Sequence, residues 1–309
     1  MITSVFRKST PLNYSIIIIA MVLFFFLYQI GHASGENSLY HYALKFSILA
    51  FTFASLFLAN FIVKKNGLSK DSAYTVLFYF IFVLFFPSVL DDIKLVLSNF
   101  FILLAMRRLV SLHSPKAIKE KIFDASLWIF IAALFHFWSI LFIILVFISI
   151  LFHAARDYRN WFLPFIAFFT IIVIFLLCAL MINQDWIAHL MQGTHFNLKI
   201  NYFDNNFQNA ALSVYATIAL FFVTSLMMSL SNRPIILHSS YKKIISAFFI
   251  GVIVFIVSPN KSSDLLIFTF APLAIMATSH IDMAQIKWQK ELILGVLIVA
   301  GVFAFFLQL

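Results

Sequence analysis

Acidic side chains in the short polar segments between long apolar runs are the first residues that could do chemistry. Glu36 follows the first apolar run, and Asp91 and Asp92 follow the third. A carboxylate beside a membrane accepts a proton more readily than one in water, because low-dielectric surroundings disfavour its charge. We therefore take Glu36, Asp91 and Asp92 as candidate catalytic bases. The alternative is that they only mark helix ends in water.

Two later polar segments supply candidate substrate-binding residues. The longest covers residues 183–208, and polar connections of this length are often functional. The alternative is an interfacial connector, in which 186–191 forms a short helix on the membrane surface. A second segment, 259–264, contains a lysine that could hold a phosphate as a point charge. The candidates are Asp185, His189, His195, Lys199, Lys261 and Asp264.

Histidine is frequent, but its spacing does not favour a metal site. Two histidines present ligands on one helix face when they are three or four positions apart, and no such pair occurs. Phosphate loops, dinucleotide fingerprints and nucleophile elbows are also missing from the sequence. The sequence therefore predicts no metal and no cofactor. His136 is either a functional histidine at membrane depth or part of a hairpin turn.

The elements that must position these residues are membrane helices. Hydrophobic residues make up 63% of the 309 residues and charged residues 11%. An ordinary soluble domain is about 45–50% apolar and about 25% charged. This composition excludes a soluble enzyme, a secreted disulfide scaffold, a disordered chain and a nucleic-acid-binding domain, so nucleic acid is not an expected partner. It predicts an all-α polytopic transmembrane helix bundle, with 1–309 as a single integral membrane domain.

Apolar runs long enough to cross a membrane, which takes about 20 residues, follow one another along the chain. The first is preceded by Arg7 and Lys8 and is too long for a cleavable signal peptide, so we expect it to be the first transmembrane helix. The predicted runs are 12–30, 43–63, 73–90, 95–110, 125–153, 161–182, 209–230, 243–258, 265–280 and 292–309.

The run 125–153 is too long for one upright helix, and charge bias indicates how it is arranged. If it is a hairpin, 17 of the 21 basic residues fall in segments on one side, which the positive-inside rule assigns to the cytoplasm. If it crosses once, Arg233, Lys242 and Lys243 move to the outside. The charge distribution therefore favours a hairpin, about 10–11 membrane segments and a cytoplasmic N-terminus. The basic face would contact anionic membrane lipids.

Two resemblances accompany this pattern. The whole chain resembles a bacterial family of uncharacterised integral membrane proteins of similar length, beginning with Met1-Ile2-Thr3-Ser4-Val5-Phe6-Arg7-Lys8. This resemblance implies an inner-membrane location. The stretch Lys261-Ser262-Ser263-Asp264, followed by Ala271-Pro272-Leu273-Ala274, resembles more weakly the C-type membrane glycosyltransferases. That likeness implies a polyprenyl-phosphate-linked sugar as donor. Where those enzymes carry an acidic pair in the first outer loop, this chain has only Glu36.

Three functions follow as alternatives. The first is a glycosyltransferase-like enzyme or an accessory protein, acting on lipid-linked sugars at the outer face of the inner membrane. The second is a transporter or permease, although matching pairs of broken helices are not evident in the sequence. The third is a non-catalytic subunit of a membrane complex, whose partners would be other membrane subunits.

Overall fold

The computed structural model describes residues 2–32, 38–114, 116–183, 185–199, 203, 205–259 and 261–309, with the side chains of Ile2 and His189 also outside the description. Every regular element in these ranges is a helix. Eight of the helices are long and apolar enough to cross a membrane, and two shorter apolar segments, Tyr74–Phe85 and Phe137–His153, accompany them. The prediction of an all-α polytopic membrane protein is therefore confirmed.

The chain divides into two compact units. Unit 1 contains Met1–Val96, Tyr202–Arg233 and Ser262–Leu309, and unit 2 contains Leu97–Asn201 and Pro234–Lys261. The expectation of a single domain over 1–309 stays a prediction.

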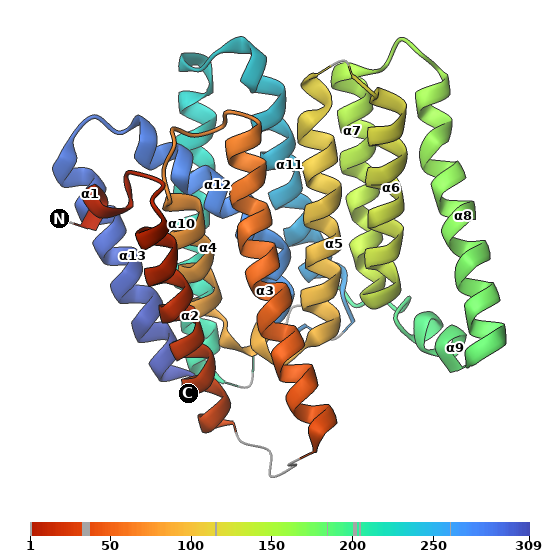
Figure 1. Cartoon of the computed structure of the whole chain (residues 1–309), viewed down its shortest axis with the longest axis horizontal. Coiled ribbons are helices and arrows are strands. Elements are labelled where there is room, and N and C mark those ends of the chain that lie inside the picture. The colour runs from red at the N-terminus through yellow and green to blue at the C-terminus, as the bar shows by residue number, and fades with distance from the viewer. Residues whose placement is uncertain are drawn as a thin grey trace. The chain divides into compact units, whose positions relative to one another are not determined.

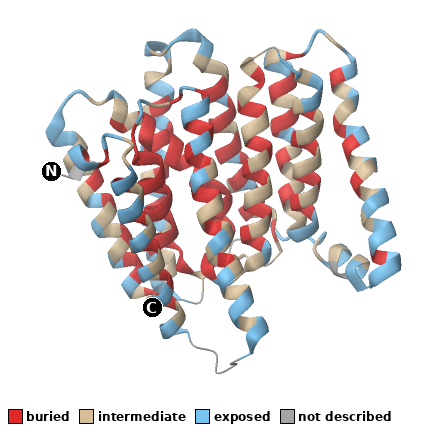
Figure 2. Ribbon diagram, in the orientation of Figure 1, coloured by how far each residue is buried: buried red, intermediate tan, exposed pale blue. Residues whose placement is uncertain are grey.

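Unit 1 is built around two buried helices, α4 (Tyr74–Phe85) and α12 (Ile267–Met283). Every residue of α4 is buried, as its uniformly apolar sequence predicts for a helix surrounded by protein (Figure 2). The hydroxyls of Thr75 and Thr278 lie 3.0 Å apart and join the two helices. Around them lie α1 (Ile2–Phe6), α2 (Pro11–Gly31), α3 (Leu39–Lys65), α10 (Asn206–Ser229) and α13 (Lys287–Leu307).

Helix α4 ends where a proline follows. Phe86 precedes Pro87, and the proline ring disfavours helical backbone at the residue before it. Phe86 accordingly has φ −137° and ψ 74°, and the chain continues as a short 3-10 helix, η1 (Pro87–Leu90). The polar residues that follow η1 therefore lie at the end of the buried helix pair.

Unit 2 contains α6 (Ile118–Phe135), α7 (Ile143–His153), α8 (Arg159–Ile182), the short α9 (Asp185–Gln192) and α11 (Ile235–Val257), together with most of α5 (Ile93–Val110). Helix α6 packs on α8 through Phe130, Ala167 and Ile171. Large apolar side chains on the opposite side of α8, such as Phe162 and Phe169, are exposed. Membrane lipid can cover such a face at no hydrophobic cost, because its tails are as apolar as the side chains.

The run 125–153 is a hairpin, as the charge distribution predicted. Helices α6 and α7 lie side by side and are joined at one end by the 3-10 helix η3 (Phe137–Phe142) (Figure 1). The ammonium of Lys119, in the first turn of α6, lies 3.1 Å from the carboxylate of Asp157, just after α7. Such a pair forms only if the two helices run in opposite directions. His136 lies at the turn, where its Nε2 is 3.1 Å from the hydroxyl of Ser258.

Contacts within unit 1 group its loops into two ends, as predicted. At one end of unit 1, Thr3 contacts Glu291, and the backbone N–H of Lys70 donates to Asp282 over 3.0 Å. At its other end, Gln29 donates to the carbonyl of Leu90 over 3.3 Å. The side of the membrane on which each end lies stays a prediction.

Candidate functional site: an acidic cavity in unit 1

Two 3-10 helices meet at one end of unit 1, opposite the end at which the N-terminus lies. These are η1 and η5 (Ser263–Leu266), and they contact each other directly. The hydroxyls of Ser88 and Ser263 lie 3.0 Å apart across this contact. Because η1 ends α4 and η5 begins α12, the buried helix pair fixes the position of both turns. The polar residues beside them, Asp91, Asp92 and Asp264, are thereby brought to one place.

Asp91 is engaged by two side chains from other helices. One carboxylate oxygen accepts a hydrogen bond from the hydroxyl of Tyr28 over 2.6 Å, and the other contacts the ammonium of Lys45 over 2.7 Å. Tyr28 comes from the end of α2 and Lys45 from α3, so Asp91 links three segments of unit 1. Both of its carboxylate oxygens therefore already have partners within unit 1. This geometry favours a structural role for Asp91.

Asp92 is engaged by the backbone. Its Oδ1 accepts hydrogen bonds from the N–H groups of Lys94 over 2.8 Å and of Leu95 over 3.2 Å. These N–H groups belong to the first turn of α5, where no helical partner exists for them. Asp92 is therefore the N-cap of α5, and the positive end of the helix stabilises its charge.

Asp264 is the carboxylate that the fold leaves incompletely satisfied. Its Oδ1 is buried, and within the described ranges it accepts no hydrogen bond. A buried acceptor without a partner costs about 1–3 kcal/mol, so such groups in native proteins generally bind water or a ligand. Of the three aspartates, Asp264 is therefore the one best able to accept a proton or hydrogen bond from a bound molecule.

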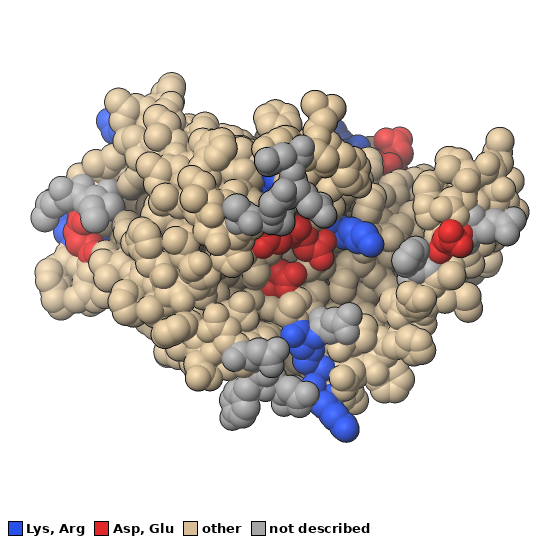
Figure 3. Space-filling model, turned by 90° about the horizontal axis from the view of Figure 1, so that it is seen from below, with Lys and Arg blue, Asp and Glu red and all other residues tan. Residues whose placement is uncertain are grey.

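The three aspartates line a cavity of about 520 Å³. Acidic side chains gather on this face of the protein (Figure 3). Serine hydroxyls and an amide add neutral donors and acceptors, and Lys94 adds one cation. The lining residues are Ser88, Asp91, Asp92, Ile93, Lys94, Gln208, Ser262, Ser263 and Asp264. Such a lining suits a molecule rich in hydroxyl groups or carrying positive charge.

Metal binding receives no support from this geometry. Over the residues that the structure describes, no three His, Cys, Asp or Glu side chains are arranged to hold a metal ion. Asp91 is held by Tyr28 and Lys45, and Asp92 by the backbone of α5, which makes both poor candidates for shared metal ligands.

The other predicted site residues belong elsewhere. Glu36 lies outside the described residues, and so does the side chain of His189 in α9. Four residues lie in unit 2 and not in the unit that holds the cavity: Asp185, His195, Lys199 and Lys261.

Those four residues have local contacts. Asp185 begins α9, which confirms a short helix at the predicted place. The carbonyl of His195 accepts a hydrogen bond from the indole N–H of Trp138 over 3.0 Å. The backbone N–H of Lys199 donates to the side chain of Asn197 over 2.9 Å, and the ammonium of Lys261 donates to the carbonyl of the same asparagine.

Sequence reasoning missed the residues that complete the cavity. Ser88 and Ser263 each come shortly after a proline and lie within three residues of an aspartate, and that shared arrangement was the available signal. Gln208 and Tyr28 gave no signal, because each lies in or beside an apolar run and meets the cavity residues only through folding.

Comparison with known proteins identifies a family but no activity. Residues 8–309 match the model of a family of unknown function, DUF6427. The chain belongs to this family. The match agrees with the predicted resemblance to an uncharacterised family. No curated protein and no solved structure matches the chain, so the likeness to C-type glycosyltransferases stays a prediction.

Proposed function

We propose that this integral membrane protein acts on a lipid-linked sugar in the bacterial inner membrane, with the acidic cavity of unit 1 as its sugar-binding site. The observation that carries the proposal is the incompletely satisfied Asp264 in a cavity lined by hydroxyl and carboxylate groups. Sugar hydroxyls are donors, and a buried carboxylate oxygen without a partner gains most from a donor. The polyprenyl chain would lie in the surrounding membrane.

The geometry also supports one catalytic role. In a glycosyl transfer, an acceptor hydroxyl oxygen bonds to the anomeric carbon of the donor, and the bond from that carbon to the phosphate oxygen breaks. The polyprenyl phosphate leaves with the bonding electrons, and a general base takes the hydroxyl proton. Asp264 is the best placed carboxylate for this step, whereas Asp91 and Asp92 position the cavity. An accessory protein would bind the sugar at the same place without transferring it.

Binding of a lipid-linked sugar tests the proposal. The protein in nanodiscs is exposed to a polyprenyl-phosphate sugar carrying a photoreactive group, and labelling is quantified for the wild type, Asp264→Asn and Glu120→Gln. The last variant removes one exposed acid from unit 2. We expect competable labelling of the wild type and the control, and a loss of about tenfold in Asp264→Asn, as about 1.4 kcal/mol of hydrogen bonding implies. Equal labelling of all three would contradict the proposal.

A transporter is the second candidate, and one observation favours it. The 3-10 helices η1 and η5 lie at the end of α4 and the start of α12 and contact each other, and helix termini that meet at a polar site bind substrates in many transporters. Uptake of a solute into proteoliposomes, abolished in Asp264→Asn, would support a transporter in place of an enzyme.

A further inference from the structure

A second cavity lies in unit 2, where three helix ends meet. It has a volume of about 410 Å³ and lies between the start of α6, the end of α7 and the start of α8. It shares no residue with the acidic cavity of unit 1. The lining residues are Ile118, Lys119, Leu151, Phe152, His153, Ala154, Ala155, Arg156, Asp157 and Asn160.

The charges of this cavity leave one cation without a counter-ion. Asp157 accepts a hydrogen bond from the backbone N–H of Arg159 over 3.0 Å and pairs with Lys119 over 3.1 Å, and both contacts lower its pKa. Asp157 is therefore ionised at neutral pH and offsets the charge of Lys119. Arg156 is exposed and has no ion-pair partner among the residues described, so the cavity carries a net positive charge.

Part of the cavity wall is apolar, and further apolar side chains are exposed on the neighbouring helices. Leu151 and Phe152 line the cavity and are 59% and 43% exposed. Beyond the cavity, on α8, Phe162 and Phe165 are 60% and 55% exposed. A cation at a helix end with an apolar surface below it matches the two parts of a phospholipid, whose phosphate lies at the membrane surface and whose acyl chains lie beneath it.

Two buried polar atoms in the lining lack a hydrogen-bond partner within the described ranges, Nε2 of His153 and Oδ1 of Asn160. Asn160 is only 3% exposed, and its Nδ2 donates to the carbonyl of Ala154 over 3.0 Å. Its Oδ1 accepts no hydrogen bond within the described ranges. This acceptor needs a donor, which a bare phosphate diester lacks but a glycerol headgroup has.

We propose that this cavity binds the headgroup of an anionic phospholipid, with its phosphodiester at Arg156 and its glycerol hydroxyls toward Asn160. Phosphatidylglycerol has both groups. An apolar surface beside the cavity favours a lipid over free phosphate, because free phosphate would leave that surface without an occupant. The lipid would hold the hairpin α6–α7 and the start of α8 together, since all three contribute to the lining.

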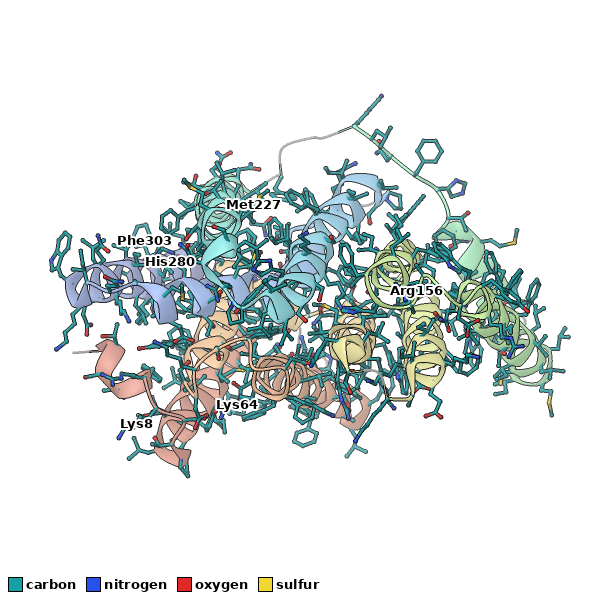
Figure 4. The ribbon with its side chains drawn as sticks, turned by 90° about the horizontal axis from the view of Figure 1, so that it is seen from above. Lys8, Lys64, Arg156, Met227, His280 and Phe303 are labelled. Atoms are coloured by element: carbon teal, nitrogen blue, oxygen red, sulfur yellow. The ribbon has the colours of Figure 1, made fainter. Side chains whose placement is uncertain are left out.

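Native mass spectrometry of the purified protein tests this site. Delipidated protein in mild detergent is titrated with phosphatidylglycerol, and bound lipid is counted for the wild type, Arg156→Gln and Lys8→Gln. Lys8 is an exposed cation of unit 1, so its variant removes the same charge elsewhere; Figure 4 labels both residues. We expect Arg156→Gln to bind phosphatidylglycerol about fivefold more weakly, the effect of one cation near an anionic headgroup, and Lys8→Gln to match the wild type.

Three outcomes would overturn the proposal. The first is equal binding by Arg156→Gln and the wild type. The second is equal binding of phosphatidylcholine, which would indicate lipid that covers the helices without selecting a headgroup. The third is full displacement of the lipid by millimolar inorganic phosphate, which would indicate a phosphate site. Helicity and thermal unfolding of each variant, measured in the same detergent, show that a loss of lipid does not follow from a loss of fold.

Discussion

Enlarging Gly301 tests the packing that positions the acidic cavity. Gly301 lies on α13 and faces α4, where an added Cβ would meet Ile81 Cγ2 at 3.1 Å and the Ile81 carbonyl oxygen at 3.4 Å. Gly295 lies on the same helix, and an added Cβ there would have no neighbour within 4 Å. Small residues let membrane helices approach closely, so the two glycines differ in what they do for packing. Comparing substitutions at Gly301 and Gly295 therefore separates the effect of packing from the effect of helix propensity.

The magnitude follows from these distances. Gly301→Ala requires Ile81 to move by a few tenths of an ångström, and that cost is offset by the roughly 1 kcal/mol by which alanine favours a helix over glycine. Gly301→Val places two more methyl groups against α4, and overpacking of this kind costs about 1–3 kcal/mol. Gly295→Val carries the same change in propensity without the contact. We expect only Gly301→Val to destabilise the protein.

Thermal unfolding in detergent, followed by helicity at one scan rate, is the assay. For a chain of this size about 1 kcal/mol corresponds to roughly 2–4 °C, so Gly301→Val should unfold on the order of 2–12 °C below the wild type. Gly295→Val and Gly301→Ala should remain close to the wild type. Equal unfolding temperatures for the two valine variants would refute the close approach of α13 to α4.

The remaining predictions concern the cavity walls and the orientation. Asp92→Ala removes the N-cap of α5 and should cost about 1 kcal/mol, measured as a lower unfolding temperature that Asp92→Asn largely avoids. Tyr28→Phe removes one hydrogen bond to a carboxylate that Lys45 also holds, so a loss of about 1 kcal/mol is expected, and no loss would show that Tyr28 does not support Asp91. The predicted cytoplasmic N-terminus is tested with Ser9→Cys in a protein whose Cys178 is changed to serine. This cysteine should react with a membrane-impermeant thiol reagent only after the inner membrane is permeabilised. Reaction in sealed spheroplasts would contradict the predicted orientation.

The sequence predicted the helices well because membrane crossing imposes a simple requirement on composition. Runs such as 161–182 and 209–230 differ by two or three residues from α8 and α10. The hairpin at 125–153 was also predictable, since the side on which basic residues fall depends on the number of crossings. The ends of the helices were harder to predict from the sequence. Helix α4 ends before Pro87, but the predicted run continued to residue 90 because apolar residues continue through η1.

The site was only partly predictable, because its residues meet through packing and not through spacing. Asp91, Asp92 and Asp264 were all identified as candidate site residues, and the sequence assigned the catalytic role to Glu36, Asp91 and Asp92, which stays a prediction. Their partners explain why the geometry favours Asp264: Tyr28 and Lys45 engage Asp91, and the first turn of α5 engages Asp92. Contacts of this kind join residues tens of positions apart in the chain, so no local pattern indicates them.

Photolabelling by a polyprenyl-phosphate sugar in nanodiscs, with the labelled residues located by peptide mapping, shows whether the acidic cavity binds the sugar. We expect labels on peptides containing η1 or η5, suppressed by unlabelled lipid-linked sugar and reduced about tenfold in Asp264→Asn. Labels spread over lipid-facing helices such as α8, and equal in the wild type and Asp264→Asn, would contradict this expectation.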